Sequence, residues 1–82
     1  MRAYVLVEAK VGMAGDISEA LRTMSLTEGH ILSVDVVTGP YDIIALLEAD
    51  DLDLLGRAVS ESIQVIEGVG RTTTCLVMRL SS

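Results

Sequence analysis

The stretch ILSVDVVTGPYDIIALLEA, residues 31–49, decides the fold of this chain. It contains two apolar runs of strand-forming residues, 31–38 and 43–49, and they are joined by the corner Thr38-Gly39-Pro40-Tyr41-Asp42. Gly accepts a positive φ and Pro presets the neighbouring turn, so the corner predicts a pair of connected strands. Such a corner has no structural need for a Tyr and an Asp. These two residues therefore mark the corner as the first place to look for function.

Strand and helix patterns continue on both sides of this stretch. Residues 2–9 alternate in a strand-like way, and residues 72–80 form the last predicted strand. A helix is expected from an N-cap at Asp16 to Glu28-Gly29, and a second from Asp50 or Asp51 to Glu67-Gly68. Their apolar stripes are Ile17, Ala20, Leu21 and Met24 in the first, and Leu52, Leu55, Val59, Ile63 and Ile66 in the second.

The resulting order is strand-helix-strand-strand-helix-strand. Two βαβ units of this length with right-handed crossovers give an α+β fold, the ferredoxin-like βαββαβ sandwich. Four antiparallel strands then carry two helices on one face. The 82 residues are expected to form a single domain, 1–82.

One face of this sheet is left without helices, yet its residues are apolar. Tyr4 and Leu6 lie opposite the row of Ala3, Val5 and Val7. Val37 and either Ile44 and Leu46 or Ile43 and Leu47 join them. In the last strand, Cys75 and Val77 lie on one side, with Leu76, Met78 and Leu80 on the other. Monomers rarely expose so large an apolar patch, so we expect a second copy to pack against it, sheet to sheet.

Composition excludes several classes of function. The net charge is −6, and the 6 basic residues are scattered singly, so the chain offers no track for the phosphates of DNA or RNA. No metal-ligand spacing, nucleophile–base pair or cofactor motif is present. Cys75 is expected to be a small buried residue, and His30 a surface residue. With no signal peptide or membrane span in the sequence, we expect a cytoplasmic protein without a membrane partner.

Three motifs together resemble a known family. They are Thr38-Gly39-Pro40-Tyr41-Asp42, the helix end IQVIEGV at residues 63–69, and Thr72-Thr73-Thr74. Over residues 2–80 the chain resembles the effector-binding (RAM) domain of the Lrp/AsnC (feast/famine) transcriptional regulators. Those regulators carry a preceding helix-turn-helix domain, whereas here Met1 directly precedes the first strand. The chain therefore looks like a stand-alone version without its own DNA-binding domain.

The resemblance implies a homodimer, the association of dimers into a higher-order ring, and an amino-acid effector bound between dimers. It leaves open a co-assembly with full-length Lrp/AsnC regulators. By the same resemblance the candidate ligand-binding residues are Gly39, Tyr41, Asp42, Thr72 and Thr74.

For each candidate a structural role competes with the ligand role. Gly39 serves the turn, and Tyr41 is either a half-buried corner ring or a phenol that lines a pocket. Asp42 either hydrogen-bonds its own backbone or offers its carboxylate to the effector's ammonium group. Strand alternation puts the hydroxyls of Thr72 and Thr74 on one face, where they can converge on a ligand.

The sequence therefore predicts a sensing and assembly module rather than an enzyme. A small dimeric ferredoxin-like enzyme, of the monooxygenase or isomerase type, is the first alternative. Such enzymes line their cavity with aromatic, His or Asn side chains, and this chain has only 2 Tyr and 1 His. A purely structural assembly domain is the second alternative.

Overall fold

The computed structural model describes residues 1–80 and confirms the predicted order of strands and helices. A π-helical segment, η1, continues the second helix. The elements are β1 (Arg2–Ala9), α1 (Ala14–Thr23), β2 (His30–Val36), β3 (Ile43–Glu48), α2 (Leu52–Arg57), η1 (Ala58–Ile63) and β4 (Val69–Leu76).

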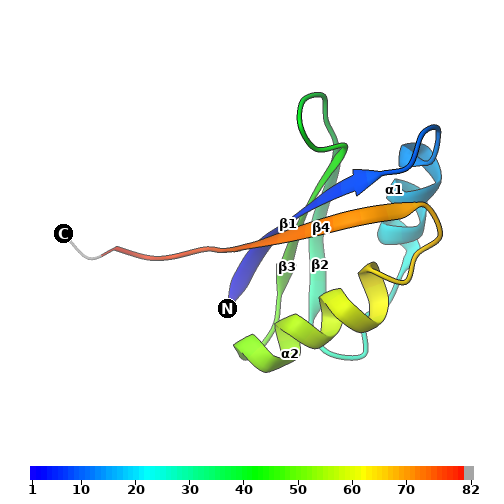
Figure 1. The fold of residues 1–82 in the computed structure, drawn as a ribbon. Helices are drawn as coiled ribbons and strands as arrows, with labels where there is room; N and C mark the ends of the chain where they lie inside the picture. The colour runs from blue at the N-terminus through cyan, green and yellow to red at the C-terminus, as the bar shows by residue number, and fades with distance from the viewer. Residues whose placement is uncertain (81–82) are drawn as a thin grey trace.

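The strands form a single antiparallel sheet in the order β2-β3-β1-β4, with β2 and β4 at its edges (Figure 1). Val5 in the central strand β1 pairs with Ala45 of β3 on one side and with Thr74 of β4 on the other. The two strands in the middle of the sheet are thus β1 and β3, each followed by a helical crossover. This is the ferredoxin-like arrangement that the sequence predicts.

The core lies between the helices and one face of the sheet. Alternate residues of β1 and β3 point into it, as the two-residue period of a strand requires. The fully buried members are Ala3, Val5, Val7, Ile43, Ala45 and Leu47 from the sheet and Ile17, Leu21, Leu55 and Ile63 from the helical segments. The phase of β3, which the sequence left open, is thereby settled, since Ile44 and Leu46 lie on the face without helices.

That open face is apolar at its centre, as predicted. Tyr4, Leu6, Ile44 and Leu46 lie together on β1 and β3, and Tyr4 is 44% exposed. Cys75 lies on the same face, opposite Tyr4, and is exposed. The prediction of a buried Cys75 is therefore wrong for the single chain, because the sequence did not tell which face of β4 the helices cover.

The first helix begins and ends earlier than predicted. Its N-cap is Met13, which makes no side-chain cap bond, and Asp16 lies within the first turn, so the capping role predicted for Asp16 is wrong. The reason is tertiary: the loop before the helix is fixed when Lys10 N donates to the Gly68 carbonyl (2.7 Å) and Met13 N to that of Lys10 (3.0 Å). A helix can then start at Ala14. Its end at Thr23 leaves Gly29 in the loop that enters β2.

Gly29 is needed where it stands. Its φ is +94°, and a Cβ at this position would collide with the backbone carbonyl of Glu48 at the end of β3. Only glycine tolerates both the left-handed backbone and this close approach. The residue therefore lets the loop pack directly against the sheet.

The second helix is capped as predicted but changes form. The carboxylate of Asp51 accepts a hydrogen bond from Leu54 N (2.9 Å). After Arg57 the helix widens into η1, where Gln64 N donates to the Val59 carbonyl five residues back (2.8 Å). The helix does not reach Glu67-Gly68. Turns that follow Ile63 lead into β4 instead.

The last strand also begins earlier than predicted. It starts at Val69, because that residue pairs with Ala9 across a register shift between Glu8 and Ala9. It ends at Leu76 rather than at residue 80. The second strand, His30–Val36, likewise begins one residue before the predicted range and ends before Thr38.

Candidate functional site

Asp42 fastens the corner to the rest of the sheet. Its backbone N donates to the Val7 carbonyl (2.9 Å), and its own carbonyl accepts from Val37 N (2.9 Å). Its carboxylate oxygen Oδ2 accepts from Ala9 N at 2.7 Å. The side chain therefore bonds a strand 33 residues away in the sequence, not its own turn. Within residues 1–80 the other carboxylate oxygen, Oδ1, has no hydrogen-bond partner, so Asp42 can accept a further donor.

The rest of the corner projects beyond the end of the sheet (Figure 1). Gly39 adopts a φ of +127°, a backbone conformation that favours glycine, and no atom approaches the place of its absent Cβ. Tyr41 is half-buried beside Asp42. Gly39 thus serves the turn, and Tyr41 directly precedes Asp42 in the chain.

A hollow of about 340 Å³ lies at the start of β4, and the residues lining it are Gln64, Val69, Gly70, Arg71 and Thr72. Gln64 Nε2 donates to the hydroxyl of Thr72 (2.9 Å). Arg71 Nε is 3.7 Å from Glu8 Oε2, a loose ion pair across the strands, and the arginine side chain is mostly exposed. Arg71 borders the hollow from the open-face side of β4, whereas Gln64 and Thr72 border it from the helix side. The hollow is thus lined from two sides by a guanidinium, an amide and a hydroxyl, groups that bind a carboxylate.

The corner and the hollow lie at the same end of the sheet but do not form one pocket. Val7 in β1 pairs with Ile43 on one side and with Thr72 on the other, so β1 separates Asp42 from Thr72. Two strand spacings correspond to roughly 10 Å. One small ligand bound to Asp42 thus does not reach the hydroxyl of Thr72 in the same chain.

The two threonines differ in their surroundings. Thr72 and Thr74 share a face, as strand alternation predicts, because they pair with Val7 and Val5. Thr72 is half-buried and bonded to Gln64, whereas Thr74 lies outside the hollow.

Two residues of the hollow were not predicted from the sequence. Gln64 reaches Thr72 because η1 widens the helix just before it, and such a π segment has no clear sequence signature. In the sequence, Arg71 is one of six singly scattered basic residues, so its charge alone did not indicate a site. Its position next to Thr72 in the last strand was the available signal.

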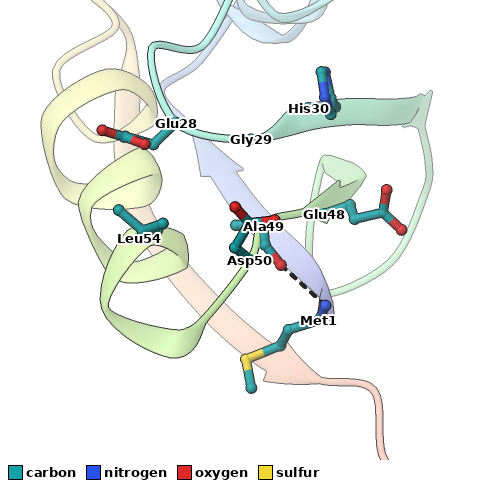
Figure 2. A pocket seen from close by; sticks show the side chains of 8 residues that line it. All are labelled: Met1, Glu28, Gly29, His30, Glu48, Ala49, Asp50 and Leu54. Atoms are coloured by element: carbon teal, nitrogen blue, oxygen red, sulfur yellow. Dashed lines mark hydrogen bonds between the residues drawn. The ribbon is translucent and has the colours of Figure 1, made fainter.

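A second hollow of about 340 Å³ lies at the opposite end of the sheet (Figure 2). Three acidic residues line it, but the carboxylates of Glu28 and Glu48 point away from each other (Figure 2). Among the described residues, no group of three or more His, Cys, Asp or Glu is placed to hold a metal ion. This hollow therefore gives no support to a metal centre.

Arg2 forms an ion pair with Glu48 at this second end of the sheet. Its Nε donates to Glu48 Oε2 at 3.0 Å. That hydrogen bond, together with the positive charge of Arg2, holds the pKa of the Glu48 carboxyl below its ordinary value. The pair is solvent-exposed and belongs to the rim of the open face.

No helix within residues 1–80 has the length and apolar character needed to cross a membrane.

Comparison with known proteins identifies the family. The family model of the Lrp/AsnC ligand binding domain matches residues 2–81. The chain belongs to the Lrp/AsnC ligand-binding domain family. No curated protein matches it significantly.

Solved structures agree with this assignment. TTHA0845 from Thermus thermophilus is 32% identical, with a TM-score of 0.84, and the match covers 99% of this chain and 96% of that one. E. coli AsnC is 25% identical (TM-score 0.76), and the match covers 96% of this chain and 51% of AsnC. A regulator from Neisseria meningitidis, NMB0573, solved as an L-Met complex, shares the fold at 19% identity (TM-score 0.80; 95% of this chain, 49% of that one).

Proposed function

We propose that this Lrp/AsnC domain senses a small amino acid and couples its binding to the assembly of copies of the chain. The observation that carries the proposal is the chemistry gathered at one end of the sheet. Asp42 offers a carboxylate oxygen without a partner among residues 1–80, and the hollow at Arg71 offers donors for an anion. An amino acid carries the two complementary groups, an ammonium and a carboxylate.

The ligand is bound between copies rather than within one chain. Because Asp42 and Thr72 are separated by β1, a small amino acid engages the corner of one copy and the hollow of another. Asp42 pairs with the ammonium group, while the hydroxyls of Tyr41 and Thr72 supply neutral hydrogen bonds. Gly39 gives the corner its shape.

Assembly starts at the open face of the sheet. Tyr4, Leu6, Ile44 and Leu46 form an apolar centre, and the charged pairs Arg2–Glu48 and Arg71–Glu8 lie at its two ends. A second copy packed on this face buries the apolar centre and leaves the charges at the rim, which is the usual anatomy of an interface. Dimers of this kind then associate into a ring, and full-length regulators of the family are candidate partners.

The relatives support an amino acid as the ligand. The N. meningitidis regulator that shares this fold is solved as an L-Met complex. The acidic composition of the chain argues against direct contact with nucleic acid.

A thermal-shift screen of the purified chain against the standard amino acids tests the proposal. At least one amino acid is expected to raise the midpoint of unfolding, because a ligand that binds only the folded state stabilises it. With that amino acid, Asp42→Asn is expected to weaken binding by about tenfold to a hundredfold, the value of a charge-assisted hydrogen bond. Asp50→Asn, at the other end of the sheet, is the matched control and is expected to bind normally.

Other outcomes would decide against the proposal. If Asp42→Asn lowers the stability of the free protein but keeps the full ligand shift, Asp42 is only a fastening residue for Ala9. If no amino acid shifts the unmutated chain, a purely structural assembly domain is the better description.

A further inference from the structure

A short apolar segment continues past the end of the sheet. The last backbone hydrogen bond of β4 with β1 runs from Val77 N to the Arg2 carbonyl (2.9 Å). Beyond it the chain runs straight on into solvent (Figure 1). The side chains of Val77, Met78 and Leu80 are 48%, 76% and 81% exposed. We call residues 77–80 the exit segment.

A hollow lined mainly by apolar residues lies at the other edge of the sheet. It has a volume of about 170 Å³, and its lining residues are Leu21, Arg22, Met24, Ile31, Leu32, Ser33 and Val34. This hollow lies between α1 and β2, and we call it the α1–β2 seam. One of its lining residues, Leu32, is exposed at the edge of the sheet. A hollow with apolar side chains in its wall, next to an edge strand, is suited to an added extended segment.

The exit segment cannot reach this seam within its own chain. It leaves β4, whereas the seam is at β2, and these strands are the opposite edges of the sheet. Three strand spacings amount to roughly 14 Å, and residues 78–80 span at most roughly 10 Å. An exit segment that fills the seam therefore belongs to a second copy.

The alternation of side chains in the two strands is compatible with this contact. Continued through the exit segment, it places Met78 and Leu80 on one side and Arg79 on the other. In β2, Val34 faces the core with Ala45, and Asp35 lies on the open face opposite Ile44. A segment that inserts Met78 and Leu80 into the seam thus brings Arg79 to the side of Asp35, where the charges are complementary.

We propose that the exit segment of one copy lies along β2 of a second copy, with Met78 and Leu80 in the α1–β2 seam and Arg79 beside Asp35. The Val34 carbonyl of β2 already accepts a hydrogen bond from Arg22 Nη2 (3.1 Å), so it is not free to pair with the backbone of the exit segment. The contact is therefore held mainly by side chains. The inference rests on the assembly part of the proposed function. By symmetry each dimer contains the contact twice.

A charge exchange tests the contact directly. Arg79→Asp and Asp35→Arg each place like charges together at both contacts. Each is expected to raise the dimer dissociation constant by roughly tenfold at low ionic strength. An equimolar mixture of the two variants, or the double variant, is expected to recover dimers stronger than those of either single variant, because contacts that join opposite charges are again available. Asp53→Arg, in α2, is the control and is expected to change nothing.

The readout is sedimentation equilibrium of the full chain. Recovery in the double variant supports a contact between these two side chains. Failure to recover, or single variants that assemble like the unmutated chain, would overturn the inference. If Ile44→Asp on the open face still dissociates the dimer in that case, the assembly proposal survives and only the exit-segment contact is rejected. A monomeric unmutated chain would reject both.

Discussion

Replacement of Ile44 by Asp tests the proposed sheet-to-sheet dimer at its centre. Ile44 lies on the open face and pairs with Leu6 of β1, while its neighbours Ile43 and Ala45 point into the core. The substitution therefore alters the proposed interface without entering the core. We expect Ile44→Asp to fold and to be monomeric at micromolar concentration.

The magnitude follows from the burial of the side chain. Full burial of an isoleucine is worth about 1.5–3 kcal/mol, and Ile44 is already half-buried in the single chain, so about 1 kcal/mol remains to be gained per copy. In the dimer the loss is about 2 kcal/mol, and two unpaired carboxylates between the sheets cost at least as much again. A total of about 4 kcal/mol weakens association by about a thousandfold.

Sedimentation equilibrium combined with circular dichroism checks this expectation, and Val65→Asp is the control. Val65 is 69% exposed in the turn after η1, away from the open face, so its replacement is expected to leave the dimer intact. A folded Ile44→Asp variant that dimerises as tightly as the unmutated chain would refute the reasoning about the open face.

The remaining predictions concern stability. Gly29→Ala is expected to lower the free energy of unfolding by at least about 2 kcal/mol, because its φ is +94° and the new Cβ meets a backbone carbonyl. Gly56→Ala, in open space on α2, is expected to raise the free energy of unfolding by about 0.5–1 kcal/mol. Urea titration measures both changes. Asp51→Ala removes the N-cap of α2 and is expected to cost about 1 kcal/mol in the same assay. Because the pKa of Glu48 is lowered in the folded protein, its ion pair stabilises the fold above the ordinary pKa of 4.5, and this stability is lost as the pH falls through the lowered pKa. Arg2→Met is therefore expected to make the midpoint of thermal unfolding fall less steeply as the pH is lowered. An unchanged pH profile in Arg2→Met would contradict this.

The order and type of the elements followed from local pattern. The alternation of Ala3, Val5 and Val7 predicts β1 with its correct buried side, because the two-residue period is visible in the sequence. In β3 the unbroken apolar run hides that period. The choice between Ile43 and Ile44 as the buried residue therefore required the sheet and its helices.

The contacts of the candidate site did not follow from local pattern, since they join distant segments. Asp42 was expected to bond its own turn or a ligand, but its Oδ2 bonds Ala9 in another strand. Gln64 reaches Thr72 only through the widened turn of η1. Asp16 matched a capping pattern that was overridden when the loop before α1 was fixed to Gly68. Tertiary hydrogen bonds decided all three.

The central claim is that the ligand site is completed between copies of the chain. The most direct test is calorimetric titration of the amino acid with the largest thermal shift into the unmutated protein and into Ile44→Asp. The account predicts saturable binding to the assembled protein and a loss of affinity in the monomeric variant, because Asp42 and Thr72 of one chain are too far apart for one ligand. Equal affinity for the monomer, or no binding of any amino acid to the unmutated protein, would contradict it.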